Sequence, residues 1–249
     1  MRIGLISDLH ANRQALSACL EHARTRHIEQ WAVLGDLVGY GADPVWVVER
    51  VMEMAEQGAV VIAGNHDHMA LKPRDDGQLG SSTAHWTSEQ LSAPHKSFLR
   101  GLPLTAELEN ALLVHASADK PETWPYVDDA RAAARCMSEA NAKFVKRLVM
   151  VGHVHHQALY YKGQGREWMP FKPTPGVAVP IPRHRDWVVT VGSVGQPRDK
   201  DPRAMYAIYE SDTRKIWFHR VPYDHAAAAQ AIRKAGLPAF MADRLGVGA

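Results

Sequence analysis

Eight polar side chains of types that bind metal ions follow short apolar segments of the chain. They are Asp8, His10, Asp36, Asn65, His66, His115, His153 and His155. The set holds carboxylates, imidazoles and one amide but no thiolate, which suits Mn, Fe, Zn, Ni or Co rather than a structural zinc site. A single histidine of this kind is more often structural, but packing alone poorly explains the whole set. The sequence therefore predicts a catalytic metal centre in which all but His66 are ligands.

The number and spacing of these ligands indicate two ions. Asp8 and His10 are two positions apart, as are His153 and His155. In an extended backbone such pairs point to the same side, so each pair can bind one ion. The full set exceeds what one catalytic ion needs, and it fits two ions about 3.5–4 Å apart that share a carboxylate. Asp36 is the natural bridge, so we expect two divalent transition-metal ions as cofactors.

One stretch of the chain combines a buried strand with three polar side chains. Residues 60–62 are β-branched and apolar, which is typical of a strand buried on both faces. Gly64 allows a sharp turn, and Asn65, His66 and Asp67 follow at the carboxyl end of the strand, where open α/β sheets bind ligands. The triplet suggests a metal ligand, an acid or oxyanion stabiliser, and an orienting carboxylate. The alternative is that it only caps the next helix.

The N-terminal third alternates strands with helices. The predicted order is strand 3–6, a helix capped by Asn12 through residue 23, strand 31–34, a helix from Pro44 to Gly58, and strand 60–62. This βαβαβ pattern predicts parallel strands with right-handed crossovers. Asp8, Asp36 and Asn65 should therefore reach one edge of one sheet.

The remaining elements are less regular. Residues 68–100 are predicted to be helical and able to fold over the site, and 105–108 with 111–114 to form a hairpin before His115. A strand at 147–151 precedes His153. Strands at 187–191, 204–209 and 215–221 have no helices between them, so we expect an antiparallel second sheet there. Residues 163–186 are rich in Gly and Pro and are expected to be a long loop or irregular hairpin.

Composition limits the class of protein. The chain of 249 residues has room for one large domain or two small ones, and without a clear boundary we expect a single domain over 1–249. A net charge of +2 gives no argument for a nucleic-acid or membrane partner. Cys19 and Cys136 fall in apolar helical patterns and are expected to be packing residues. Without a secretory or membrane-spanning pattern we expect a cytoplasmic protein, with a homo-oligomer left open.

Five sequence blocks, in order, resemble the signature of the calcineurin-like metallophosphoesterase superfamily. They are Asp8-Leu9-His10, Gly35-Asp36, Gly64-Asn65-His66-Asp67, His115 and Gly152-His153-Val154-His155. The compact single-domain bacterial and archaeal phosphoesterases are most similar, through residues 35–41 and 192–199. Gly39-Tyr40-Gly41 stands where protein Ser/Thr phosphatases and diadenosine tetraphosphatases carry Asp-Arg-Gly, which disfavours both activities.

The resemblance implies a fold and a division of roles. The fold is a four-layer α/β/β/α sandwich of two mixed β-sheets flanked by helices. His66 would face the phosphate, oriented by Asp67. One ion would be bound by Asp8, His10, Asp36 and His155, and the other by Asp36, Asn65, His115 and His153.

The expected function is hydrolysis of phosphate esters by a hydroxide that bridges the two ions, with His66 as acid or stabiliser. A phosphodiester, such as a cyclic or linear nucleotide, is the first expectation. The alternatives are a phosphomonoesterase acting on small metabolites or phosphoproteins, or a non-catalytic scaffold of the same fold, which His66 and the full ligand set disfavour. Expected substrate contacts are Asn12 and Arg198, and the aromatic candidates for stacking on a base are Tyr40, Trp86, Trp168 and Phe171.

Overall fold

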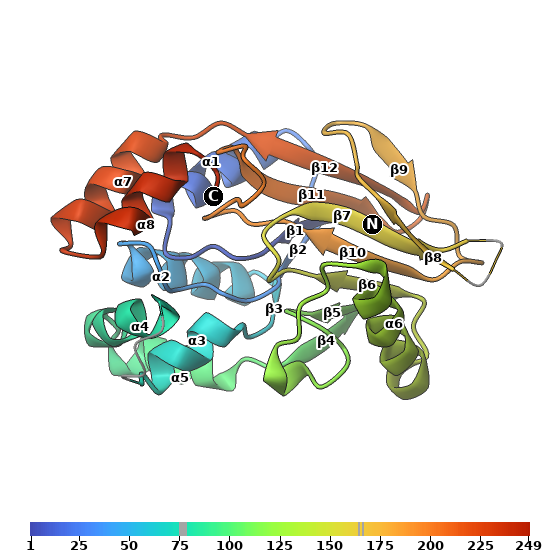
Figure 1. Cartoon of the computed structure of the whole chain (residues 1–249), viewed down its shortest axis with the longest axis horizontal. Coiled ribbons are helices and arrows are strands. Elements are labelled where there is room, and N and C mark those ends of the chain that lie inside the picture. The colour runs from blue at the N-terminus through green and yellow to red at the C-terminus, as the bar shows by residue number, and fades with distance from the viewer. Residues whose placement is uncertain (75–78, 164, 166) are drawn as a thin grey trace.

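The computed structural model describes residues 1–74, 79–163, 165 and 167–249, and in this part of the chain two β-sheets pack face to face (Figure 1). The first sheet has the order β3(Val60–Val61), β2(Gln30–Val33), β1(Arg2–Ile6), β11(Ala204–Glu210), β12(Lys215–Val221), β9(Ala178–Pro180). The second has the order β4(Thr105–Leu108), β5(Ala111–Val114), β6(Leu148–Val151), β10(Trp187–Val191), β7(Gln157–Lys162), β8(Trp168–Phe171).

Helices cover the outer faces of both sheets. Along the chain they are α1(Arg13–Ala23), α2(Pro44–Glu56), α3(Asn65–Leu71), α4(Leu79–Gln90), α5(Ala93–Gly101), α6(Ala130–Phe144), α7(His225–Lys234) and α8(Ala239–Asp243), with 3₁₀ turns η1(Pro121–Thr123) and η2(Arg244–Gly246). None of the helices in the described part of the chain is both long and apolar enough to cross a lipid bilayer.

The alternation of side chains along the strands produces the four layers. In β1, Leu5 packs in the core between the sheets, whereas Ile6 packs in the core beneath α1 and α2. In β6, Met150 belongs to the core between the sheets and Val151 to the core beneath α6. Successive side chains of these strands therefore point to opposite faces of the sheet and pack into two different cores, as a period of two requires. The predicted α/β/β/α sandwich is confirmed.

The N-terminal unit follows the prediction closely. Strands β1, β2 and β3 are parallel neighbours. The side chain of Asn12 caps α1 by accepting a hydrogen bond from the amide of Ala15 at 3.1 Å. The carboxyl ends of the three strands consequently lie at one edge of the first sheet.

Two expectations about the C-terminal half were wrong. Strands β11 and β12 belong to the first sheet, with β11 antiparallel to β1, while β10 lies in the second sheet, parallel to β6. Residues 204–209 are all buried, because both faces of this strand are covered, and β11 lies in the middle of the first sheet between β1 and β12. Within 163–186 the chain forms strands β8 and β9, both at sheet edges. Pro170 and Pro180 hide them in the sequence because proline is tolerated mainly in edge strands.

Candidate metal centre

The predicted ligands converge where the carboxyl ends of strands from both sheets meet. Two groups have ligand atoms that all lie within 4.8 Å of one another, and every member is buried. The first group is Asp8, His10, Asp36 and His155, and the second is Asp36, His115 and His153. Asp36 belongs to both, which is the position expected of a bridging carboxylate.

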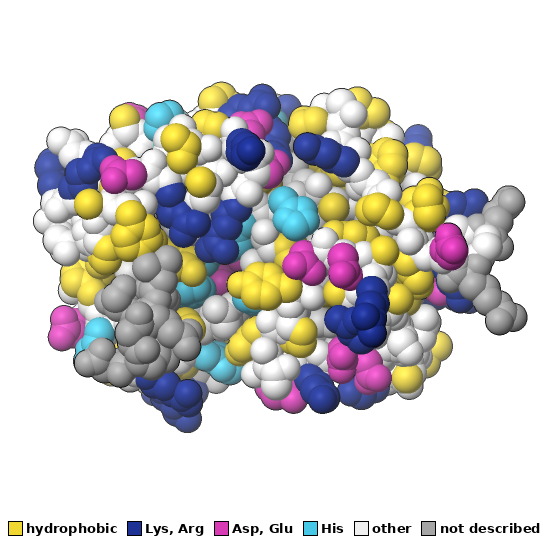
Figure 2. Space-filling view, in the orientation of Figure 1, with side chains coloured by type: hydrophobic (Ala, Val, Ile, Leu, Met, Phe, Trp, Pro, Cys, Tyr) yellow, Lys and Arg dark blue, Asp and Glu magenta, His cyan; other side chains and the backbone are white. Residues whose placement is uncertain are grey.

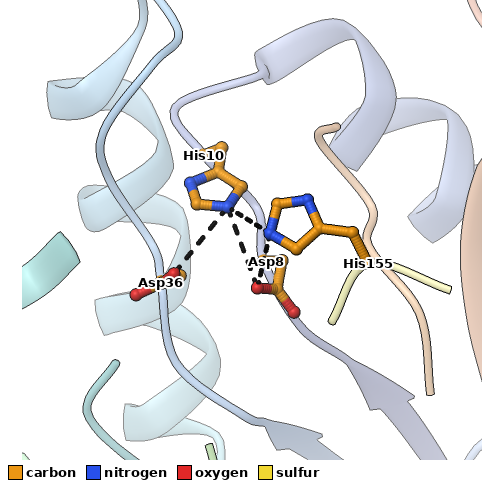
Figure 3. Close-up of side chains that lie close together, drawn as sticks. All are labelled: Asp8, His10, Asp36 and His155. Atoms are coloured by element: carbon orange, nitrogen blue, oxygen red, sulfur yellow. Dashed lines mark hydrogen bonds and ion pairs between the residues drawn. The ribbon is translucent and has the colours of Figure 1, made fainter. Parts of the chain in front are cut away.

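The first group is tightly packed (Figure 3). The Nε2 atom of His155 lies 3.1 Å from Oδ1 of Asp8 and 3.1 Å from Nε2 of His10. The Nε2 atom of His10 is also 3.8 Å from Oδ2 of Asp36. The imidazole nitrogens and carboxylate oxygens thus face one common point.

The predicted amide ligand, Asn65, lies beside the second group. The Nε2 atom of His115 lies 3.3 Å from Oδ2 of Asp36 and 3.2 Å from Oδ1 of Asn65. The ring of His153 meets that of His115 edge-on, with centroids 5.0 Å apart. All seven predicted ligands are therefore brought together, six of them in the two groups and Asn65 in contact with His115.

Hydrogen bonds set the histidines up as ligands. The Nδ1 atoms of His10, His115 and His155 lie 3.2, 2.6 and 2.6 Å from backbone carbonyl oxygens. A proton on Nδ1 donated to a carbonyl leaves Nε2 as an acceptor directed into the centre. Two such acceptors, on His10 and His155, then face each other at 3.1 Å, an arrangement that needs a cation or a proton between them.

Two further buried atoms support the same reading. Nε2 of His153 has no hydrogen-bond partner among the described residues, and Oδ1 of Asp8 has none apart from its ion-pair contact with Nε2 of His155. Buried polar atoms without partners are uncommon and point to a missing ligand or ion. The donors present, nitrogen and oxygen without sulfur, fit divalent metal ions.

The backbone of the centre is unusual. Asp8, His10, Asp36, His153 and His155 all have positive φ, between 46° and 63°. The expected extended backbone for the pairs Asp8/His10 and His153/His155 is therefore wrong, since the left-handed conformation is what directs these side chains inward. Each such non-glycine residue costs about 1–3 kcal/mol, and strain of this kind concentrates at functional sites.

Glycines allow the carboxylates to approach the neighbouring loops. A Cβ atom on Gly64 would collide with the carboxylate of Asp36, and one on Gly152 with the side chains of Ser7 and Asp8. The amide of His153 donates to Oδ2 of Asp8 at 3.0 Å. Loops from the two sheets are thus held against each other, and this contact fixes the position of Asp8.

His66 lies beside the first group, whereas Asp67 points elsewhere. The buried ring of His66 packs edge-on against His10, with centroids 5.0 Å apart. The carboxylate of Asp67 accepts hydrogen bonds from the backbone amides of Leu37 at 2.9 Å, Val38 at 3.3 Å and Gly64 at 2.9 Å. Asp67 therefore holds together the loops that carry Asp36 and His66, and it does not orient the His66 ring directly as we expected.

Charges within the centre shift the ordinary pKa values. Burial opposes the protonated form of His115, but the charge and hydrogen bond of Asp36 outweigh it and raise the pKa of His115 to about 9. Burial and the neighbouring His115 lower the pKa of His153 to about 4. Burial and the charge of Asp36 raise the pKa of Asp67 to about 7. A proton on His115 Nε2 would compete with a cation for the same lone pair.

The two predicted substrate contacts differ in their surroundings. The Asn12 side chain is buried, and both of its polar atoms form hydrogen bonds within the protein. Oδ1 caps α1, and Nδ2 donates to the carbonyl of Gly195 at 2.8 Å. Asn12 therefore shapes the loops, and its contact with substrate stays a prediction. Arg198 lies over the ring of Tyr40 at 5.7 Å, and Tyr40 packs against His66 with centroids 4.3 Å apart.

Sequence reasoning missed two aromatic residues at the centre. Trp124 and Tyr126 contact the rings of His115 and His153. Of the aromatic residues that were considered, only Tyr40 contacts the centre in the described structure, since Trp86 packs near α7 and α8, Trp168 near α6, and Phe171 lies on edge strand β8. The available signal was the run at 121–126, which holds two prolines and two aromatic residues a few positions after His115.

Comparison with known proteins gives a consistent result. The family model for the calcineurin-like phosphoesterase superfamily domain matches residues 1–214. The chain is 31% identical to an uncharacterised protein of Methanocaldococcus jannaschii, over 99% of this chain and 98% of that protein.

Solved structures agree. A metallophosphoesterase from Sphaerobacter thermophilus is 35% identical, with a TM-score of 0.87 over 100% of this chain and 99% of its own. A hypothetical protein from Pyrococcus horikoshii shares the fold at 19% identity, with a TM-score of 0.76 over 100% of this chain and 98% of its own. With the buried cluster of histidines and aspartates, the matches support a metal-dependent phosphoesterase. The chain belongs to the calcineurin-like phosphoesterase superfamily.

Proposed function

We propose that this protein hydrolyses phosphodiesters with the help of two divalent transition-metal ions. The observation that carries the proposal is the pair of buried ligand groups that share Asp36. Asp8, His10, Asp36 and His155 would hold one ion, and Asp36, Asn65, His115 and His153 the other. When bound, such ions supply Lewis acidity, which activates water and offsets negative charge on the phosphate.

His66 would act directly on the substrate. Its ring is buried beside His10 and Tyr40, and in the described part of the structure neither ring nitrogen has a hydrogen-bond partner. A ring nitrogen is thus available to donate a proton to the leaving oxygen or a hydrogen bond to another phosphate oxygen.

Arg198 would bind a phosphate oxygen. One of its terminal nitrogens donates to Oε1 of Gln196 at 2.9 Å, and its buried Nε lacks a partner among the described residues. No aspartate or glutamate of the described residues forms an ion pair with Arg198, so its charge is available to an anion. Two N–H donors along one edge of a guanidinium group match the spacing of two phosphate oxygens.

The surroundings of the centre favour a diester over a monoester. Tyr40 and Arg198 lie on the side of His10, and Trp124 and Tyr126 lie on the side of His115 and His153. Both alcohol groups of a diester would therefore have protein surface to contact, whereas a small monoester would use only one side.

The test compares two substrates with the same chromophore. Purified protein is loaded in turn with Mn, Fe, Co, Ni or Zn and assayed with bis-p-nitrophenyl phosphate and p-nitrophenyl phosphate. The proposal expects a higher kcat/KM for the diester. A preference for the monoester would refute the diester assignment, and no turnover with any of these metals would refute hydrolysis.

The role of His66 has its own test. Because general acid–base groups contribute roughly 10²–10⁴-fold to rates, His66→Ala should lower kcat by about that factor. Its metal content should stay at the wild-type level, because His66 belongs to neither ligand group. A variant with wild-type kcat, or one that has lost its metal, would contradict the assignment.

A further inference from the structure

Two aromatic side chains lie against the second ligand group, on the segment between β5 and α6. The ring of Tyr126 stacks on that of His153, with centroids 4.1 Å apart and planes 23° apart. The ring of Trp124 meets His115 edge-on at 5.8 Å and His68, on α3, edge-on at 5.2 Å. Together they form an aromatic wall, defined here as Trp124 and Tyr126, on one side of the candidate centre.

The wall is accessible to a ligand. Tyr126 is 52% exposed even though one face of its ring covers His153. The exposed part of an aromatic ring offers a π-face for stacking. Figure 2 shows yellow hydrophobic side chains beside cyan histidines near the centre of this face of the molecule. A single exposed aromatic residue needs no explanation, but this one touches a candidate metal ligand.

The segment that carries the wall is held at both ends. Val127 is buried, and the side chain of Asp129 caps α6 by accepting from the amide of Ala132 at 2.6 Å. On the other side of η1, the amide of Ala118 donates to Sγ of Cys136 at 3.4 Å. A wall fixed in this way loses little conformational entropy when a ligand binds.

Backbone strain marks the same segment. Lys120 and Trp124, at the two ends of η1, have left-handed φ values of 52° and 55°. Non-glycine residues in this region are strained and persist where the surrounding structure holds them. The left-handed conformation of these two residues turns the chain on both sides of η1, and Trp124 thereby lies against His115 and His68.

We propose that the aromatic wall binds a planar ring of the substrate, which makes nucleotides and their esters the substrate class of this enzyme. This inference rests on the proposed function and specifies its substrate. A nucleobase can stack on Tyr126 whatever its identity, because every base presents a π-face. Stacking of one base on an aromatic side chain is worth roughly a 5- to 150-fold change in affinity.

The experiment uses pairs of substrates in which one member carries a base and the other does not. The diester pair is thymidine 5′-(p-nitrophenyl phosphate) and methyl p-nitrophenyl phosphate, which share a leaving group. The monoester pair is AMP and ribose 5-phosphate. In manganese-loaded Tyr126→Leu, kcat/KM should fall roughly 5- to 150-fold for the base-containing member and less than about twofold for its partner. Tyr126→Phe keeps the ring and should retain the wild-type preference.

A matched control separates stacking from a general surface effect. Phe171 is 44% exposed on edge strand β8. Phe171→Leu should therefore have the wild-type kcat/KM for every substrate. An equal loss for both members of a pair in Tyr126→Leu would show that Tyr126 acts only through His153, and it would overturn the inference.

Binding gives a readout that is independent of turnover. Calorimetric titration with a non-hydrolysable nucleoside phosphonate and with methylphosphonate should show weaker binding by Tyr126→Leu for the nucleoside ligand alone. If wild-type protein hydrolyses none of the esters, the proposed function fails, and the titration still decides the role of the wall. Equal nucleoside affinity in wild type and Tyr126→Leu would refute that role.

Discussion

Replacing Asp67 by asparagine tests whether this residue acts on the backbone or on His66. The carboxylate is fully buried and accepts three amide hydrogen bonds, two through Oδ1 and one through Oδ2. The asparagine amide has one acceptor oxygen, so it can replace the two bonds of Oδ1 but then directs its NH₂ group toward the amide of Gly64. The variant thus loses one bond and leaves a buried donor facing another donor.

The expected loss of stability follows from those contacts. A hydrogen bond to a charged group contributes about 1.5–3 kcal/mol, and an unsatisfied buried donor costs about 1–3 kcal/mol. Because burial raises the pKa of Asp67 to about 7, part of the charged-bond contribution is already lost near neutral pH. We therefore expect Asp67→Asn to lower the free energy of unfolding by about 2–4 kcal/mol.

The assay is urea unfolding in the presence of a chelator, so that bound metal does not contribute to stability. Asp224→Asn is the matched control, because Asp224 caps α7 with a single bond to the amide of Ala227 and asparagine caps helices about equally well. Its free energy of unfolding should change by less than about 0.5 kcal/mol. If Asp67→Asn were as stable as wild type and yet lost activity, our account of Asp67 would be wrong and direct action on His66 would be favoured.

Two further predictions concern other parts of the molecule. Gly152→Ala should weaken metal binding at least roughly tenfold, because the added Cβ collides with Asp8. Gly101→Ala is the control and should bind metal normally, because a Cβ there meets no atom within 4 Å. Calorimetric titration with Mn²⁺ measures both affinities. Burial lowers the pKa of His219 from 6.5 to about 4, so the unfolded chain binds more protons in this window. His219 should therefore contribute a loss of about 1–3 kcal/mol as pH drops from 6.5 to 4. The free energy of unfolding of His219→Phe, measured with urea, should change between these pH values without this contribution, so the difference between wild type and variant should shift by that amount.

The sequence was most informative where local patterns determine the structure. The βαβαβ unit follows from apolar strands and capped helices, and parallel strands must end at one edge of the sheet. The convergence of Asp8, Asp36 and Asn65 could therefore be predicted. His115 and the pair at 153 and 155 could be named as candidate ligands from their residue types and their positions after predicted strands. Because they come from the other sheet, only the resemblance assigned each of them to a particular ion.

What failed depends on long-range packing. The partner of β11 is β1, about 200 residues away in the sequence, and no local pattern encodes that pairing. The left-handed backbone at Asp8 and His10 is imposed by neighbouring loops, as their amides donate to the carbonyls of Gly35 and Asp36. Asp67 was misassigned for the same reason, since its amide partners lie mostly in a different loop.

The central claim is that Asp36 joins two metal sites in one buried centre. The most direct measurement is the number of Mn²⁺ ions bound per chain, counted by elemental analysis after equilibrium dialysis, in wild type and in Asp36→Asn. We predict two ions in wild type and weakened binding of both in the variant. One ion or none in wild type, or a variant that loses only one of two ions, would contradict the account.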